Sequence, residues 1–131
     1  MVIDPISDMI TRVRNASRVG KPQVVVSFSN LNLNLANVLK KAGFIKGVTK
    51  NSRFSRQYIC LDIAYNDKGK AVLSEIYRVS KPSRRIYRKA NEIHTVRQGK
   101  GLSIISTPKG LLTDKEARKE KIGGEVLCKL W

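Results

Sequence analysis

The spacing of the apolar residues changes along the chain, and this change limits the possible folds more than any other feature. Near the start, four apolar residues recur at the spacing of one helix face: Ile6, Met9, Ile10 and Val13. This pattern predicts an amphipathic helix over residues 4–16. Asp4 can cap it, and Pro5 fits the first helical position, where the missing N–H leaves no hydrogen bond unmade.

A strand and a second helix are expected next. The β-branched run at 23–28 predicts the strand. Residues 31–42 allow two interpretations, because their first leucines alternate as in a strand while later apolar residues have helical spacing. The helical residues are Leu35, Val38, Leu39 and Ala42. We favour the helix, with Asn30 as its N-cap and Gly43 at its end.

Two more strands, at 44–48 and 57–65, complete the first half of the chain. A basic loop is expected to join them, and residues 66–69 (Asn-Asp-Lys-Gly) are typical of a turn. The first half therefore has the order α-β-α-β-β, in which both helices can cover one face of a small sheet.

The second half is predicted to be mainly β. Its expected strands lie at 71–79, 85–87, 102–106 and 126–130. Thr113 and Glu116 match a capping box, which predicts a short helix over 114–120. Gly123 and Gly124 are expected to end this helix, a role that would account for Gly123.

These elements predict an α+β fold made of two small packed subdomains. The expected division gives an N-terminal α-β-α-β-β subdomain over residues 1–68. The remaining residues, 69–131, form the mainly β subdomain with one short helix.

The charge indicates the kind of partner. The chain has 26 lysines and arginines against 10 aspartates and glutamates, a net charge of +16. No acid lies between Asp8 and Asp62, and Glu92 is the one acid between Arg78 and Lys100. Such long basic stretches favour nucleic acid as the partner. A membrane surface is disfavoured, because its signature is a basic amphipathic helix and these cations are scattered over strands and loops.

Several classes of protein are excluded by what the sequence lacks. No apolar run approaches the roughly 20 residues of a membrane span, and the first residues resemble neither a signal nor a transit peptide. Cys60 and Cys128 are expected to be inert core thiols. His94 is the single histidine, so no metal, no cofactor and no acid–base catalysis is expected.

The segment from Ser106 to Thr113 is the most suggestive. A strand delivers two hydroxyls, a lysine and a glycine to a position just before an expected helix N-terminus. Hydroxyls, exposed N–H groups and a helix end suit phosphate and 2′-hydroxyl groups. An ordinary strand–helix turn is the alternative. The glycine spacing of a Walker loop and the serine setting of a nucleophile elbow are both absent.

Other candidates lie on either side of this segment. Arg84 and Arg85 are expected to contact phosphates. Tyr87 could stack on an unpaired base or sugar, or equally pack into the core. Glu125 cannot bind phosphate, but it could accept hydrogen bonds from base amino groups or orient a lysine.

Together these motifs resemble the small-subunit ribosomal protein S8 family of the bacterial and organellar type. The resemblance covers essentially the whole chain and rests on 4–6, 8–12, 14–16, 78–87, 106–110, 113–118, 123–128 and the terminal Trp131.

This resemblance implies a non-enzymatic protein of the small ribosomal subunit. Such a protein binds the central domain of the small-subunit rRNA directly and early in assembly. Its partners include neighbouring small-subunit proteins and, in some bacteria, its own mRNA. The residues that correspond to the family's RNA contacts are Ser106, Thr107, Lys109, Gly110, Gly124, Glu125, Tyr87 and Arg14. The serine–threonine loop is expected in the RNA minor groove, with lysines and arginines on phosphates.

Three departures from the family pattern stand out. Pro108 replaces a frequent second serine, Ser83 replaces a usual glycine, and 91–101 is less regular. Pro108 favours an alphaproteobacterial or mitochondrial lineage, so the expected location is the ribosome of a bacterial cytoplasm or a mitochondrial matrix, with a plastid less favoured.

Two other functions fit the sequence less well. A free-standing DNA or mRNA binder would be expected to carry a helix that fits the major groove, and no helix-turn-helix pattern is present. An enzyme would have to use Ser106 or Cys128 as nucleophile, and the chain has no evident triad.

Overall fold

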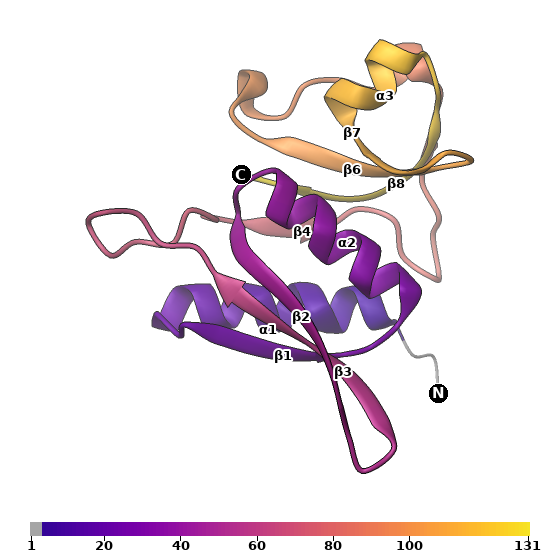
Figure 1. Ribbon diagram of the computed structural model, residues 1–131. Coiled ribbons are helices and arrows are strands. Elements are labelled where there is room, and N and C mark those ends of the chain that lie inside the picture. Colours follow the sequence, from indigo (N-terminus) through magenta and orange to yellow (C-terminus); the bar gives the residue numbers. More distant parts are fainter. Residues whose placement is uncertain (1–3) are drawn as a thin grey trace. The chain divides into compact units, whose positions relative to one another are not determined.

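The computed structural model describes residues 4–131 and divides into two compact units (Figure 1). The first unit extends to Ser74 and the second runs from Glu75 to Trp131. The subdomain boundary expected between 68 and 69, and the packing of the subdomains on one another, stay predictions. The expectation about the first residues rests partly on Met1, Val2 and Ile3, which lie outside the described residues.

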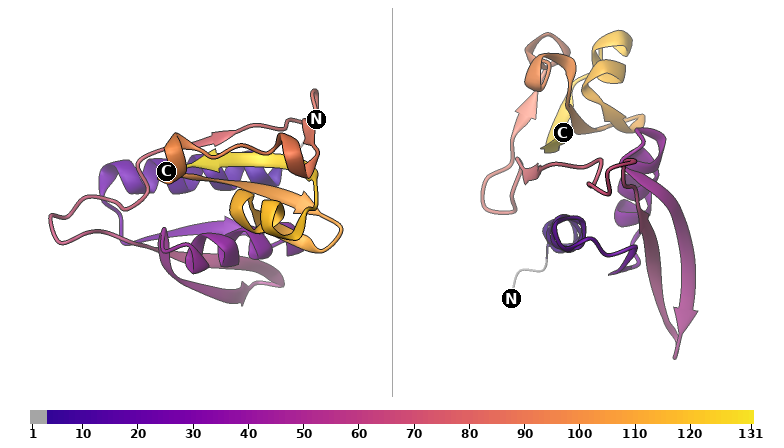
Figure 2. Two further views of the ribbon diagram at one scale, coloured as in Figure 1. Left: turned by 90° about the horizontal axis from the view of Figure 1, so that it is seen from above. Right: turned by 90° about the vertical axis from the view of Figure 1, so that its left-hand side faces the viewer.

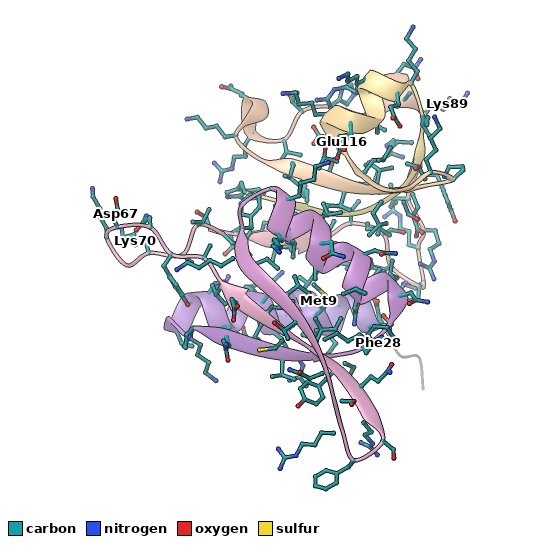
Figure 3. All side chains as sticks on the ribbon, in the orientation of Figure 1. Met9, Phe28, Asp67, Lys70, Lys89 and Glu116 are labelled. Carbon is teal, nitrogen blue, oxygen red and sulfur yellow. The ribbon has the colours of Figure 1, made fainter. Side chains whose placement is uncertain are left out.

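The first unit begins with the predicted helix, α1 (Pro5–Val19). The Asp4 carboxylate caps it by accepting from the Ser7 N–H at 3.3 Å and the Ser7 hydroxyl at 2.6 Å. Gly20 ends it with a left-handed φ of 79°. The apolar stripe is buried as the spacing predicts, and Met9 on this stripe is labelled in Figure 3. The Asp4 cap was predicted from the sequence, whereas the helix runs three residues beyond the predicted end at residue 16, and Gly20 was not predicted as its cap.

The second helix, α2 (Asn30–Lys41), settles the ambiguity in favour of a helix. Its N-cap is Ser29, whose hydroxyl accepts from the Asn32 N–H at 3.0 Å, so the expectation of Asn30 as cap is wrong by one residue. Asn32 is buried and donates to the Ser27 carbonyl at 3.0 Å, which ties the start of the helix to the preceding strand.

The sheet of the first unit has the antiparallel order β1-β3-β2. Its strands are β1 (Gln23–Ser27), β2 (Ile45–Arg53) and β3 (Arg56–Ile63). Burial alternates along β3, where Ile59, Leu61 and Ile63 are covered and the residues between them are partly exposed. The helices therefore cover one face of the sheet and leave the other open.

One local expectation for this unit is wrong. Residues 49–53 and Arg56 do not form a basic loop but extend the two strands until only Phe54 and Ser55 connect them.

The second unit is a five-stranded antiparallel sheet, in the order β4-β8-β6-β7 with β5 also paired to β8 (Figure 2). The strands are β4 (Ile76–Arg78), β5 (Tyr87–Arg88), β6 (Leu102–Thr107), β7 (Gly110–Thr113) and β8 (Gly124–Leu130). Two short 3-10 helices, Ala90–Glu92 and Arg97–Gly99, lie in the less regular segment. Of the strand expected at 71–79, only β4 forms, and β7 was not expected.

The remaining helix, α3 (Asp114–Glu120), has the predicted bounds and the predicted capping box. The Thr113 N–H donates to Glu116 Oε1 at 3.2 Å, and Thr113 Oγ1 accepts from the Glu116 N–H at 3.3 Å. Ala117 of this helix is buried with Ile93 and Ile105 in the core of the unit. The structure thus has the predicted α+β fold, with more helix in its first half and more strand in its second.

Candidate nucleic-acid interface

The hairpin of β6 and β7 carries the segment singled out in the sequence. Thr107 and Gly110 are paired across it, so Pro108 and Lys109 form a two-residue connection. Gly110 has a φ of 103°, which residues with a side chain rarely adopt. The expectation that this loop leads directly into a helix N-terminus is wrong, because β7 separates the loop from α3. The positive end of the helix therefore lies a strand's length from the loop.

Thr107 braces this loop with its hydroxyl. Its Oγ1 donates to the Gly110 carbonyl at 2.8 Å and accepts from the Lys109 N–H at 3.1 Å. Pro108 adds rigidity through its fixed φ. The Lys109 side chain is exposed at the tip. Thr107 therefore sets the loop conformation, and Lys109 places an exposed positive charge at the tip of the loop.

Ser106 belongs to a row of side chains that crosses three strands. It is paired with Glu125 of β8, and Glu125 is in turn paired with Tyr87 of β5. Directly paired residues of antiparallel strands point to the same face. Residues distant in sequence therefore share one face, which we call the Ser106 row: Ser106, Glu125 and Tyr87. Among the described residues, the Ser106 hydroxyl makes no hydrogen bond.

Two glycines allow the strands of this row to approach closely. A Cβ at Gly124 would lie 2.1 Å from the Ser106 carbonyl oxygen, and one at Gly123 would lie 2.4 Å from the Arg88 carbonyl oxygen. The expectation that a helix cap accounts for Gly123 is wrong, since α3 ends at Lys121 with a φ of 57°. Both glycines are present because the neighbouring backbone leaves no room for a side chain.

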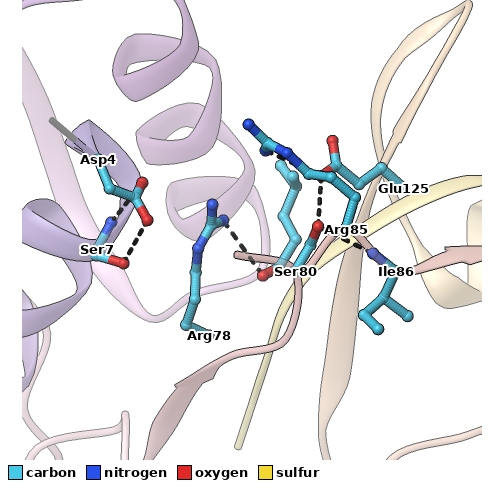
Figure 4. Close-up of polar contacts among 8 residues, drawn as sticks. Asp4, Ser7, Arg78, Ser80, Arg85, Ile86 and Glu125 are labelled. Carbon is cyan, nitrogen blue, oxygen red and sulfur yellow. Dashed lines mark hydrogen bonds and ion pairs between the residues drawn. The ribbon is translucent and has the colours of Figure 1, made fainter. Parts of the chain in front are cut away.

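The Glu125 carboxylate is fixed within the second unit (Figure 4). It accepts a hydrogen bond from the Ser80 hydroxyl, and Arg85 Nη1 forms a salt bridge to it at 3.1 Å. Ser80 is fully buried, and its Oγ also accepts from the Ile86 N–H at 3.2 Å. Glu125 therefore orients an arginine rather than the lysine considered in the sequence. Sequence reasoning missed Ser80, since a lone serine at the end of an expected strand gives no signal.

Tyr87 and Arg84 are both open to solvent. Tyr87 is 64% exposed, so the alternative that it packs into the core is wrong. Arg84 lies in a turn in which its backbone pairs with Lys81, and the described residues include no ion-pair partner for its guanidinium. Ser83 in this turn does not adopt a positive φ, so replacing a glycine there does not strain the backbone.

Arg14 lies in the first unit, on α1, and is half-buried. The contact of Arg14 with the RNA backbone, which the family resemblance implies, stays a prediction.

The enzymatic alternative finds no support in the site. Burial raises the pKa of the Cys128 thiol to about 12, and the charge of Arg78 opposes this only in part. Such a thiol is neutral near pH 7 and inaccessible to a substrate. Cys60 is half-buried on β3, so it is not the core thiol expected. Residues 4–131 hold no cluster of possible metal ligands, and no helix in that range is long and apolar enough to cross a bilayer.

Comparison with known proteins identifies the family. The sequence profile of the family described as "Ribosomal protein S8" matches residues 4–131. This chain belongs to the ribosomal protein S8 family. It is 49% identical to the small ribosomal subunit protein uS8 of Syntrophus aciditrophicus, over 98% of this chain and 97% of that protein. It is 45% identical to the uS8 proteins of Rhodopirellula baltica and Finegoldia magna, over 99% and 100% of both chains respectively.

The S8 match includes both units, with the Ser106 row and its hairpin inside it. Membership of this family, whose proteins are structural ribosomal components, confirms the expectation that the chain is not an enzyme.

Proposed function

We propose that this chain is a structural protein of the small ribosomal subunit that binds the central domain of the small-subunit rRNA through the β6–β7 hairpin and the Ser106 row. Its membership of the S8 family supports the ribosomal role. The observation that carries the RNA contact is the register that places an unbonded Ser106 hydroxyl, an anchored Glu125 and an exposed Tyr87 on one face.

The shape of this face suits a double-helical RNA. The minor groove of A-form RNA is wide and shallow, and it presents 2′-hydroxyls and base edges. Ser106 is short enough to donate to or accept from a 2′-hydroxyl without lifting the strand away from the groove. Tyr87 offers a flat face for an unstacked base or sugar, and the exposed cations Arg84 and Lys109 would contact phosphates.

The network behind Glu125 gives the interface rigidity. Its carboxylate has fixed partners on Ser80 and Arg85, so its orientation is set before RNA arrives. A base amino group that donates to Glu125 would therefore bind with little loss of side-chain entropy. Such a contact would supply sequence discrimination, because phosphates provide affinity without identifying bases.

Cellular context follows from the relatives, which come from bacteria. They support a ribosome in the bacterial cytoplasm and give no support to the mitochondrial alternative. Early entry into assembly, contacts with neighbouring small-subunit proteins and binding to its own mRNA are parts of the proposal. The net charge of +16 makes binding to a polyanion favourable and strongly dependent on salt. We expect no binding to duplex DNA as tight as to the RNA target.

The decisive experiment measures binding of the full chain to a central-domain rRNA fragment, a scrambled hairpin and duplex DNA at about 0.2 M salt, where non-specific contacts weaken. Ser106→Ala is expected to weaken binding to the fragment by roughly 1–3 kcal/mol, the range for a polar readout contact. A double variant that adds Thr107→Ala is expected to be weaker still, because it also removes the brace of the loop.

Two controls separate contact from folding. Thr95→Ala removes an exposed hydroxyl of the same unit outside the Ser106 row and should leave affinity unchanged. Thr107→Ser keeps the bracing hydroxyl and should bind nearly as the unchanged protein does. Equal affinity of the Ser106→Ala variant and the unchanged protein for the fragment would contradict the proposed contact. Equal, weak binding to all three nucleic acids would contradict the proposed function.

A further inference from the structure

The β2–β3 hairpin extends beyond the third strand of its sheet. The pairing of β1 with β3 ends at Ser27 and Tyr58, while β2 and β3 continue to the pair Arg53 and Arg56. Figures 1 and 2 show this hairpin running free of both helices of its unit. Its outer part therefore contributes little to the core of the first unit.

The tip of this hairpin is a bulky aromatic residue in an unfavourable conformation. Phe54 and Ser55 are its two connecting residues, with φ values of 52° and 64°. Positive φ at both positions is the pattern of a type I′ turn, which favours Asn-Gly. The Phe54 side chain is 86% exposed, and its ring contact is with the neighbouring Arg53, 5.2 Å from the ring centroid. Packing within the fold does not explain this phenylalanine.

The surroundings of the tip are strongly cationic. The hairpin carries four exposed cations and no acid outside its base: Lys46, Lys50, Arg53 and Arg56. Among the described residues, these four make no ion pair. Lys50 lies over the ring of Phe28, 4.3 Å from its centroid, and the Phe28 N–H donates to the Gln57 carbonyl at 3.2 Å, so this contact lies partway along the hairpin. Asp62, the nearest acid, is held at the base by Gln23 at 2.9 Å.

We propose that this hairpin is a second RNA-binding element, in which Phe54 stacks on an unpaired base while Arg53 and Arg56 contact the flanking phosphates. The inference rests on the proposed function, since it takes RNA as the partner. Aromatic rings beside arginines are the usual platform for unpaired bases, because every base offers a π face and every nucleotide a phosphate. The element differs from the Ser106 row, which suits the groove of a paired helix.

RNA fits the hairpin better than an acidic protein surface does. The paired residues next to the tip are both arginines, whose planar guanidinium groups bind phosphates in a bidentate manner and stack on flat π systems. With both arginines free of ion pairs to described residues, binding to successive phosphates breaks no described salt bridge.

The test uses the full chain and a single-stranded oligoadenylate of about ten nucleotides, with the same strand in a duplex as comparison. The main variant is Phe54→Asn with Ser55→Gly, which removes the aromatic ring and installs the residues that this turn prefers. It should fold at least as well as the unchanged protein. Its affinity for the single strand should fall about fivefold or more, the lower end of base–aromatic stacking.

Two further variants test the stacking and the charge separately. Phe54→Trp should keep the affinity and show quenching of tryptophan fluorescence by oligoadenylate beyond that of the unchanged protein, whose single tryptophan is Trp131. Arg53→Gln with Arg56→Gln should reduce the slope of log affinity against log salt concentration by about two, one for each lost phosphate contact. The Phe54 ring is still present in this variant, so stacking remains possible.

The outcomes separate this inference from the proposed function. Single-strand affinity that is unchanged in the Phe54→Asn, Ser55→Gly variant overturns the inference. Polyglutamate binding that is lost in that variant while oligoadenylate binding persists also overturns it, in favour of an acidic protein partner. Ser106→Ala should leave oligoadenylate binding unaltered and weaken binding to the central-domain fragment. If Ser106→Ala weakens binding to the central-domain fragment while the Phe54→Asn, Ser55→Gly variant binds oligoadenylate as the unchanged protein does, the proposed function stands and the role of the hairpin is refuted.

Discussion

The two hairpins of this protein have connections of the same length, but their turns are stabilised to different degrees. Each connects its strands with two residues: Pro108-Lys109 in the β6–β7 hairpin and Phe54-Ser55 in the β2–β3 hairpin. The first is braced by a threonine hydroxyl and has its positive φ at a glycine. The second has positive φ at two residues with side chains.

This difference shows how a turn is kept in place. The β6–β7 hairpin continues into a sheet whose strands are in backbone contact at Gly124, so its loop is preorganised. The β2–β3 tip has two-stranded support only, and its phenylalanine increases the conformational cost. A residue that makes folding harder without adding packing is better explained by a contact outside the chain.

The largest expected effect is at Gly124 of β8, which lies against Ser106 of the braced hairpin. Gly124→Val places a side chain where a Cβ would already lie 2.1 Å from the Ser106 carbonyl oxygen. We expect a loss of about 3 kcal/mol in the free energy of unfolding, at the upper end for overpacking. Urea denaturation measures it. Gly110→Ala, at a positive φ with open space around it, is the matched control and should cost about 1 kcal/mol. If both variants lost the same free energy of unfolding, the close approach of β8 to the Ser106 backbone would not be the reason for glycine at position 124.

The next effect is at the anchored carboxylate. Glu125→Ala leaves the buried Ser80 hydroxyl without its acceptor, at an expected cost of about 1–3 kcal/mol. Glu125→Gln keeps an acceptor oxygen and should cost less. Thermal unfolding of the two variants side by side makes the comparison. An alanine variant as stable as the glutamine variant would contradict a structural role for this network.

A smaller effect of opposite sign is expected at the strained tip. Phe54→Asn with Ser55→Gly should raise the free energy of unfolding by about 1 kcal/mol, because the replacements tolerate positive φ. Urea denaturation measures this change, and the dependence of the free energy of unfolding on urea concentration should be the same in both proteins. A loss of stability would show that the phenylalanine supports the fold, and it would remove the contrast between the hairpins.

The smallest effect concerns two neighbouring arginines. Arg84 has no ion-pair partner among residues 4–131, whereas Arg85 is paired with Glu125. Arg84→Gln should reduce the salt slope of RNA binding by about one phosphate contact. Arg85→Gln should reduce it less, since the charge of Arg85 is already partly compensated. The slope of affinity against salt concentration checks both, and a larger change for Arg85 would contradict the geometry.

Local sequence signals predicted the elements whose causes are local. The cap at Asp4, the proline that follows it and the capping box of Thr113 with Glu116 act over three or four residues, and all three are present. The extension of β2 to Arg53 was missed because its outer residues are polar and do not alternate. The strand β7 was missed because a four-residue strand after Gly110 resembles a loop.

The sequence by itself determined the α+β class, the basic charge and, through its motifs, the S8 family. Only the tertiary structure decided that Ser106, Glu125 and Tyr87 form one row and that Glu125 orients Arg85. The physical reason is range. Helix caps depend on neighbours within one turn, whereas strand register is set by backbone pairing between segments some twenty to forty residues apart, and no local pattern specifies which of them meet.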